Sequence, residues 1–243
     1  MVDCEIFIGW DSRERTAWDV CARSIIAHAG LPPFIRPISM DAMREVGLYR
    51  RPTSRDSAGR LHDDISHAPM STEFALARFF VPFLARSQYA IFCDADFMFR
   101  ADIAGLIAHA ENRYAMMVVK HPRYTPTEDI KMDGQEQTSY DRKNWSSLMI
   151  WNMSSAGARR LNVHDANTRN GLWLHTFGWL EDKEIGGLPP EWNWLEGTSD
   201  SGIEPKAVHF TRGTPDMGLT GLASADEWNA HLPCGQQLIK RVA

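Results

Sequence analysis

Two aspartates separated by one residue follow an apolar run near the middle of the chain. The run spans residues 89–93, and Asp94-Ala95-Asp96 comes directly after it. A continuous apolar segment of this length is typical of a strand buried on both faces. Open α/β sheets bind ligands beyond the carboxyl ends of such strands, where two unpaired carboxylates would repel each other. A divalent cation such as Mg²⁺ or Mn²⁺ relieves that repulsion, so the pair is a candidate metal site.

The Asp-x-Asp pattern has a second explanation, because chance alone produces such pairs and a capped turn before a helix at Asp102 would use them too. A third ligand is available in His209, within the apolar segment 208–210. A histidine there is also explained as a hydrogen-bonded core residue. As a ligand beside two carboxylates it would favour Mn²⁺ over Mg²⁺. Gly213 would let backbone N–H groups approach phosphate oxygens.

Other polar residues lie beside aromatic or apolar segments. Aromatic faces stack on the C–H faces of sugar rings, and neighbouring carboxylates and amides bind the hydroxyls. Residues 179–194 combine these types, and the alternative is a tryptophan-rich core. The polar and aromatic candidates there are Asp182, Glu184, Trp192 and Asn193. Ser146 and Ser147 stand at the start of an apolar strand, a weak signal alone.

Arg78 lies on the apolar face of a segment with helical period, residues 71–86. An arginine on such a face must find an anion or a carboxylate. Pro82 interrupts the same segment and predicts a kink.

The elements that would position these residues alternate between strand and helix. Residues 4–8 and 34–38 read as strands around a helix, and Asp11 with Glu14 resembles its capping box. Further strands are predicted at 115–119, 145–151 and 206–210, with a short helix at 102–110. Residues 50–69 are polar and read as a mobile surface loop, either a disordered insertion or an active-site lid. The prediction is one α/β domain over residues 1–243 with a mainly parallel sheet flanked by helices and a less regular C-terminal half.

Composition narrows the function classes. The chain has 243 residues, 44% hydrophobic and 23% charged, with a formal charge of −5. That balance excludes fibrous and wholly disordered proteins and argues against nucleic-acid or membrane-surface binding. No stretch of eighteen apolar residues or signal-peptide pattern is present, and the four cysteines read as reduced thiols. Cytoplasmic localisation is therefore expected.

In this order, the motifs resemble the GT-A-fold nucleotide-sugar glycosyltransferases, especially glycosyltransferase family 8 and its bacterial relatives. The likeness runs from Ile6 to Pro215. Its parts are a first strand with a nucleotide loop at Gly9, Trp10 and Asp11, the helix with Arg78, the Asp94-Ala95-Asp96 motif, a sugar-site strand with Ser146 and Ser147, and the late segment His209 to Gly213. Thr214-Pro215-Asp216 replaces the usual Lys-Pro-Trp, which leaves Arg212 as the candidate phosphate ligand.

The resemblance implies a glycosyltransferase that uses Mn²⁺ or Mg²⁺ and a UDP-sugar. It implies that Asp94, Asp96 and His209 bind the metal, and that transfer to a carbohydrate or other hydroxyl acceptor retains the anomeric configuration. Residues 1–120 would form the nucleotide-binding half and 121–243 the acceptor half. Arg78 would contact the phosphates or the aspartate pair, and Asp182 would orient the acceptor or stabilise the reacting sugar. Front-face attack assisted by the leaving phosphate is preferred over Asp182 as a covalent nucleophile.

Two other functions fit the same sequence features. A sugar-nucleotide nucleotidyltransferase also uses a parallel α/β sheet with an acidic metal site, although such enzymes open with a glycine-rich basic loop that residues 9–13 lack. A catalytically silent carbohydrate-binding domain would keep the tryptophans and show no metal-dependent nucleotide affinity.

Overall fold

The computed structural model of the protein describes residues 3–122 and 142–234 and is built around a central sheet. The six strands in spatial order are β10 (Ile185–Gly187), β8 (Met116–Val118), β9 (Leu148–Asn152), β6 (Tyr89–Cys93), β1 (Cys4–Gly9) and β2 (Ile35–Ile38). β9 runs antiparallel to both of its neighbours, and the remaining neighbours pair in parallel. The prediction of a mainly parallel sheet flanked by helices is confirmed.

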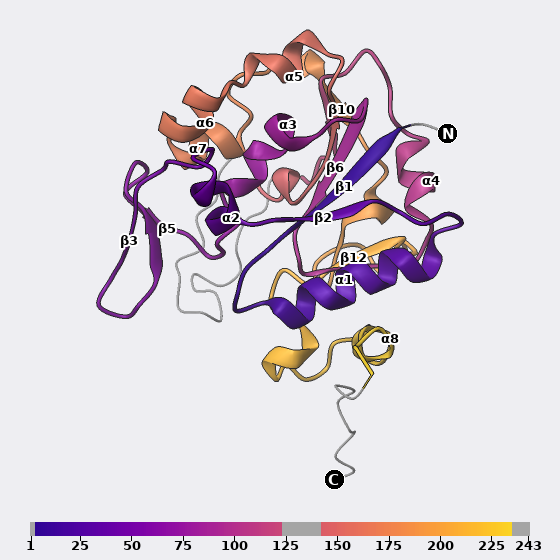
Figure 1. The fold of residues 1–243 in the computed structure, drawn as a ribbon. Helices are drawn as coiled ribbons and strands as arrows, with labels where there is room; N and C mark the ends of the chain where they lie inside the picture. Colours follow the sequence, from indigo (N-terminus) through magenta and orange to yellow (C-terminus); the bar gives the residue numbers. More distant parts are fainter. Residues whose placement is uncertain (1–2, 123–141, 235–243) are drawn as a thin grey trace.

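Helices lie on both sides of the central strands (Figure 1). They are α1 (Arg15–His28), α2 (Met40–Glu45), α3 (Val81–Leu84), α4 (Ile103–Ile107), α5 (Ala156–Arg160), α6 (Val163–Thr168), α7 (Gly171–His175) and α8 (Ala225–Ala230). In Figure 1, α5, α6 and α7 gather on one side, and α1 and α8 lie on the other. Within the described ranges, no helix has the length and apolar character that crossing a membrane requires.

A second, smaller sheet continues from the first. Its strands in spatial order are β11 (Trp194–Leu195), β12 (Ala207–His209) and β7 (Phe97–Phe99), and β12 runs antiparallel to β7. Because β7 starts just after β6 ends, the chain passes from one sheet to the other across Asp94-Ala95-Asp96. The motif therefore lies at the junction of the two sheets.

The core explains why β6 is apolar throughout. Tyr89 is 4% exposed and the other four residues of β6 are fully buried, between β1 and β9. A strand with neighbours on both edges and packing on both faces has no position for a polar side chain. The first polar residues after it are consequently placed at its carboxyl end.

The prediction of a mobile loop at residues 50–69 is wrong. This segment forms an antiparallel sheet of β3 (Thr53–Arg55), β4 (Leu61–Asp63) and β5 (Ala68–Pro69). Arg51 and Asp63 are buried as a two-pronged ion pair, with Nε–Oδ1 at 3.0 Å and Nη2–Oδ2 at 2.6 Å. Arg51 Nη1 also donates to the carbonyl oxygens of Ala166 and Arg169. Two of the charged residues in this segment therefore attach it to the rest of the fold.

Three local predictions also need correction. Glu14 occupies the N-cap position of α1 without a side-chain cap, so the expected capping box does not form. The predicted helix over 71–86 is a turn followed by the 3₁₀ helix η1 (Ala77–Phe80) and α3, with Pro82 in the first turn of α3. The strand predicted from residue 145 begins at Leu148, after the 3₁₀ helix η2 (Trp145–Ser147).

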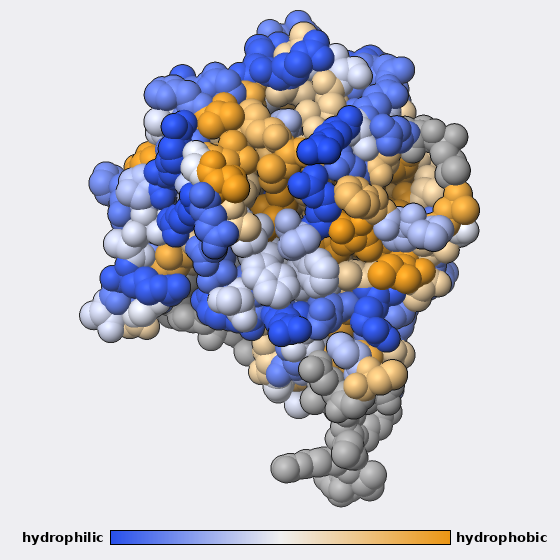
Figure 2. All heavy atoms as spheres, viewed as in Figure 1, coloured by the Kyte–Doolittle hydropathy of each residue, from blue (hydrophilic) through white to orange (hydrophobic). Residues whose placement is uncertain are grey.

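The C-terminal half is built from shorter elements, as the sequence predicts. It includes the 3₁₀ helices η3 (Asp182–Glu184), η4 (Pro190–Asn193) and η5 (Pro215–Met217). On the face drawn in Figure 2, hydrophobic patches lie at the right, over the end of α1 and the segment leading to β2. Ile26, Leu31 and Phe34 are the large exposed apolar side chains of this region. Because they lie outside the core, polar substitutions there are expected to cost little stability.

Candidate metal and donor site

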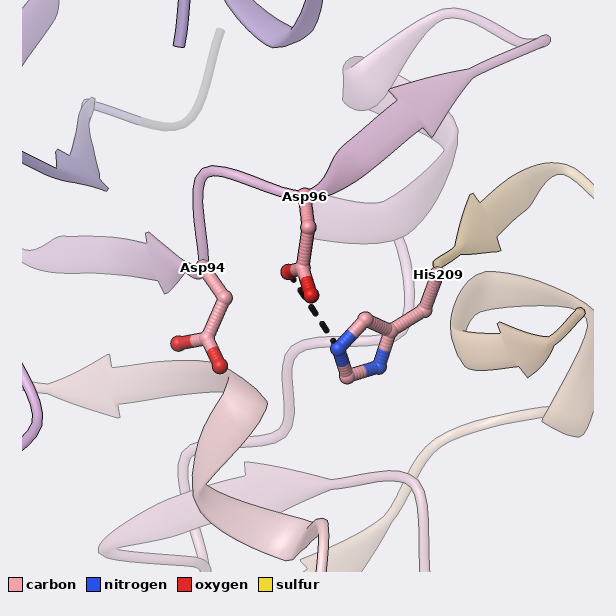
Figure 3. A group of neighbouring side chains, drawn as sticks. All are labelled: Asp94, Asp96 and His209. Atoms are coloured by element: carbon pink, nitrogen blue, oxygen red, sulfur yellow. Dashed lines mark ion pairs between the residues drawn. The ribbon is translucent and has the colours of Figure 1, made fainter. Parts of the chain in front are cut away.

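Asp94, Asp96 and His209 converge at the junction of the two sheets. One ligand atom from each lies within 4.8 Å of the others, and His209 Nε2 is 3.3 Å from Asp96 Oδ1. Figure 3 shows both carboxylates and the imidazole turned toward a common space. Residues more than a hundred positions apart therefore form one candidate site.

Strand pairing places His209 there. In the ladder between β12 and β7, His209 is the partner of Phe97, the residue after Asp96. The Phe210 N–H donates to the Asp96 carbonyl oxygen at 3.0 Å, which extends the pairing beyond the strands. The Phe97 ring stacks on the imidazole with centroids 4.3 Å apart and planes at 19°. The histidine ring is thus held in one plane next to the aspartates.

Arg78 completes the charged group. Its Nη1 lies 2.8 Å from Asp94 Oδ1 and donates to the Ser146 carbonyl oxygen at 2.9 Å. The guanidinium sits over the rings of Phe74 and Phe92, with its carbon 5.5 and 5.1 Å from their centroids. Of the two partners expected for this buried arginine, the structure shows the aspartate pair.

The electrostatics of the group suit a cation. Burial raises the pKa of the Asp94 carboxyl to about 6 and the Asp96 charge adds to this effect, while Arg78 and His209 oppose it. Asp94 Oδ1 is paired with Arg78 and Asp96 Oδ1 faces His209 Nε2, and neither buried oxygen makes a further hydrogen bond within the described residues. Two neighbouring carboxylates with a single guanidinium between them and solvent-poor surroundings repel each other, and a divalent ion would balance their charge. Two carboxylates and one imidazole fit Mn²⁺. Mg²⁺, a harder cation that prefers oxygen ligands only, is the alternative.

Gly9 and Asp11, expected at the nucleotide, serve the fold in this structure. Asp11 is fully buried and accepts hydrogen bonds from Arg13 and from the Glu73 backbone N–H. A Cβ on Gly9 would lie 2.5 Å from the Phe74 ring, so glycine is needed for that packing. Trp10, between them, is partly exposed and contacts Trp18 edge-on.

The serines and the late segment lie around the site in different roles. Ser146 Oγ is 2.8 Å from Nδ1 of His175, and Ser147 is buried beside Asn193. Arg212 is exposed. Gly213 has a φ of +119°, which favours glycine, and its N–H closes a turn onto Phe210. Ala95 is fully buried inside the Asp-x-Asp turn.

The expected acceptor residues do not form one exposed group. Asp182 is exposed and pairs with Arg142, whereas Glu184 pairs with Arg160. Trp192 and Asn193 are buried in the core, so neither presents a face to a sugar here. Trp179, in the same segment, stacks on Trp151 with centroids 5.9 Å apart. The core explanation of the tryptophans holds for these residues.

Two titratable residues near the site were missed by the sequence reasoning. Burial lowers the pKa of His121 to about 4, with a further contribution from His209, while the Asn193 side chain opposes the shift. Burial raises the pKa of Glu14 to about 8, together with the charges of Asp96, Asp11 and Asp94. The available signal was that His121 follows the carboxyl end of β8 by three residues, at the sheet edge where Asp94 follows β6.

Comparison with known proteins places the chain in a family. No family model matches it. It is 43% identical over 216 residues to Protein CDI of Arabidopsis thaliana, a match that covers 86% of this chain and 78% of the plant protein. The chain belongs to the Protein CDI family.

Solved glycosyltransferases share the fold of this CDI-family chain. The bifunctional glycosyltransferase WbbM aligns with a TM-score of 0.56 at 15% identity over 95% of this chain. GlyE of Streptococcus pneumoniae TIGR4 aligns at 0.58 and 10% over 95%. The galactosyltransferase LgtC, in complex with donor and acceptor sugar analogues, aligns at 0.51 and 10%, over 97% of this chain and 98% of its own. The chain spans 52% of the WbbM structure and 60% of GlyE. At these identities the likeness shows the fold alone.

Proposed function

We propose that this protein is a metal-dependent glycosyltransferase. It moves a sugar from a nucleoside-diphosphate sugar, with a UDP-sugar as the first donor to test, to a carbohydrate or other hydroxyl acceptor with retention of configuration. The observation that carries the proposal is the convergence of Asp94, Asp96 and His209 at the carboxyl end of β6. Ligands of open α/β sheets bind at this edge.

Asp94, Asp96 and His209 would hold Mn²⁺, or Mg²⁺, through two carboxylate oxygens and one imidazole nitrogen. A bound divalent cation supplies positive charge that stabilises a diphosphate leaving group. Arg78 would lower the repulsion within the acidic pair, because its guanidinium balances the Asp94 charge. His209 contributes a neutral donor in a plane fixed by Phe97. The partly exposed Trp10 and the exposed Arg212 are proposed to contact the nucleotide and its phosphates.

On the acceptor side, Asp182 is proposed to orient the incoming hydroxyl. Its carboxylate is exposed and is held by Arg142 on the C-terminal half of the chain. We propose residues 1–120 as the nucleotide half and 121–243 as the acceptor half.

A thermal-shift panel tests the proposal directly. Wild-type protein is measured with nucleoside diphosphates and triphosphates, each with and without Mn²⁺. Ligand binding to the folded state alone raises Tm, so a shift that needs both UDP and Mn²⁺ is expected. A preference for triphosphates would favour a nucleotidyltransferase, and no shift with any nucleotide would favour a silent carbohydrate-binding domain. Either result would overturn the proposed function.

A further inference from the structure

A chain of three hydrogen bonds leads away from the far side of His209. Nδ1 of the imidazole is 2.9 Å from Asn193 Oδ1, and Asn193 Nδ2 donates to Ser147 Oγ at 2.9 Å. The Ser147 hydroxyl in turn donates to the Asn144 carbonyl oxygen at 2.7 Å. Asn193 is fully buried, and His209 and Ser147 are each 3% exposed.

The chemistry of these groups fixes the direction of every bond in the chain. A backbone carbonyl only accepts, so the single hydroxyl hydrogen of Ser147 is used on Asn144. Ser147 Oγ is then an acceptor, and the group facing it from Asn193 must be the amide NH₂. This leaves Asn193 Oδ1 toward His209. Because that oxygen only accepts, the hydrogen of a neutral imidazole must be on Nδ1.

We propose that Asn193 is a positioning residue that holds His209 in the Nδ1–H tautomer. The lone pair of Nε2 then faces Asp94 and Asp96, which is the form a metal ligand needs. For a neutral ring the tautomer follows from these hydrogen bonds, because Asp96 Oδ1, 3.3 Å from Nε2, makes no hydrogen bond. Its use for metal binding rests on the proposed function. The acceptor role expected for Asn193 is replaced by this one.

Asn193 determines which ring nitrogen of His209 carries the hydrogen, because other residues already fix the orientation of the ring. The stacked Phe97 ring already sets the plane of the imidazole. Asn144 adopts a left-handed backbone conformation with φ at 65°, and its carbonyl accepts from Ser147 in this conformation. If the Asn193 amide were reversed, its NH₂ would face Nδ1 and the histidine hydrogen would move to Nε2. That hydrogen would occupy the direction of the candidate cation.

Nitrogen NMR of histidine in metal-free protein reads the tautomer directly, and the spectra are recorded at about pH 8, above the pKa of a free imidazole. Wild-type His209 is expected in the Nδ1–H form. Asn193→Ala and Ser147→Ala are expected to add the Nε2–H form. Asn193→Asp keeps an acceptor on Nδ1, since Ser147 can rotate its hydroxyl to donate, and is expected to retain the wild-type tautomer. Asn152→Ala is the matched control, because Asn152 is a buried amide paired with Tyr89 at the opposite end of β6 from Asp94.

Mn²⁺ titration of the same proteins tests the consequence. Asn193→Ala is expected to weaken Mn²⁺ binding by about 10- to 100-fold, the usual effect of losing a group that orients a ligand. Asn193→Asp and Asn152→Ala are expected to stay within about 3-fold of wild type. Wild-type His209 in the Nε2–H form, or an unchanged tautomer in folded Asn193→Ala and Ser147→Ala, would overturn the inference. Wild-type protein with the Nδ1–H form but no Mn²⁺ affinity would overturn the proposed function and leave the tautomer assignment standing.

Discussion

The guanidinium of Arg78 lies 2.8 Å from Asp94 Oδ1, and both groups are largely removed from solvent. Removing one partner of a buried pair leaves an uncompensated charge. Arg78→Ala is therefore expected to lower the free energy of unfolding by about 3–5 kcal/mol, measured by urea denaturation. The loss also raises the pKa of Asp94, because the Arg78 charge is what opposes the effect of burial.

A double-mutant cycle controls for the lost packing of the arginine side chain. Arg78→Met with Asp94→Asn removes both charges and keeps much of the volume, so it should recover most of the stability that Arg78→Ala loses. The single variants Arg78→Met and Asp94→Asn complete the cycle. If the double variant loses as much stability as the two single variants added together, the pair is not coupled.

The buried pair of Arg51 and Asp63 supports a second stability prediction. Arg51 joins β4 to the carbonyl oxygens of Ala166 and Arg169, so it connects the small β3–β5 sheet to α6. Asp63→Ala is expected to cost about 3–5 kcal/mol and to make residues 50–69 sensitive to limited proteolysis. Asp64→Ala, beside it and only partly buried, is the control and should leave the proteolysis pattern unchanged. A protected segment in Asp63→Ala would contradict the anchoring role.

Gly9 gives a prediction that separates packing from ligand binding. An alanine there would place its Cβ 2.5 Å from the buried Phe74 ring, so Gly9→Ala is expected to cost about 1–3 kcal/mol through overpacking. Combining it with Phe74→Leu should restore part of that loss in the thermal unfolding midpoint. A fully stable Gly9→Ala protein with weakened nucleotide binding would instead assign Gly9 to the ligand.

His175 predicts a specific dependence of stability on pH. Burial lowers its pKa to about 3, helped by the positive charges of Arg78 and Arg51, against 6.5 for a free histidine. Between these values the unfolded chain binds a proton that the folded protein lacks, so stability rises with pH up to about 6.5. Denaturation at several pH values should show His175→Gln with a shallower slope, by up to about 1.4 kcal/mol per pH unit. His164→Gln, at an exposed histidine, should keep the wild-type slope.

Local sequence patterns predicted the central strands and the place of the acidic pair after β6, because each rests on short-range information. The apolar run of β6 marks a doubly buried strand, and the position of Asp94 and Asp96 after it follows from chain order. The contact of His209 with this pair needed the family resemblance, because the pairing of β12 with β7 joins segments about 110 residues apart. The sequence identified the two carboxylates and the imidazole as possible ligands by residue type. Only the tertiary structure shows how close together they lie.

The failures share a physical cause, which is that polar residues found partners far away in sequence. Arg51 read as a solvated loop residue because its carboxylate and carbonyl partners are invisible in the local pattern. Asn193 and Trp192 read as sugar-binding residues because composition does not show burial. Asp11 read as part of a helix capping box, and its carboxylate binds Arg13 and the Glu73 backbone N–H instead.

The measurement that tests the metal site most directly is a calorimetric titration of Mn²⁺ into protein saturated with UDP. Asp96→Asn removes one charged ligand with little change in shape, and Asp41→Asn changes an exposed carboxylate on α2 as the matched control. Wild type and Asp41→Asn are expected to bind one Mn²⁺ equally well, and Asp96→Asn to bind at least about 100-fold more weakly while remaining folded. Equal Mn²⁺ affinity in Asp96→Asn and wild type would contradict a cation held by Asp94, Asp96 and His209.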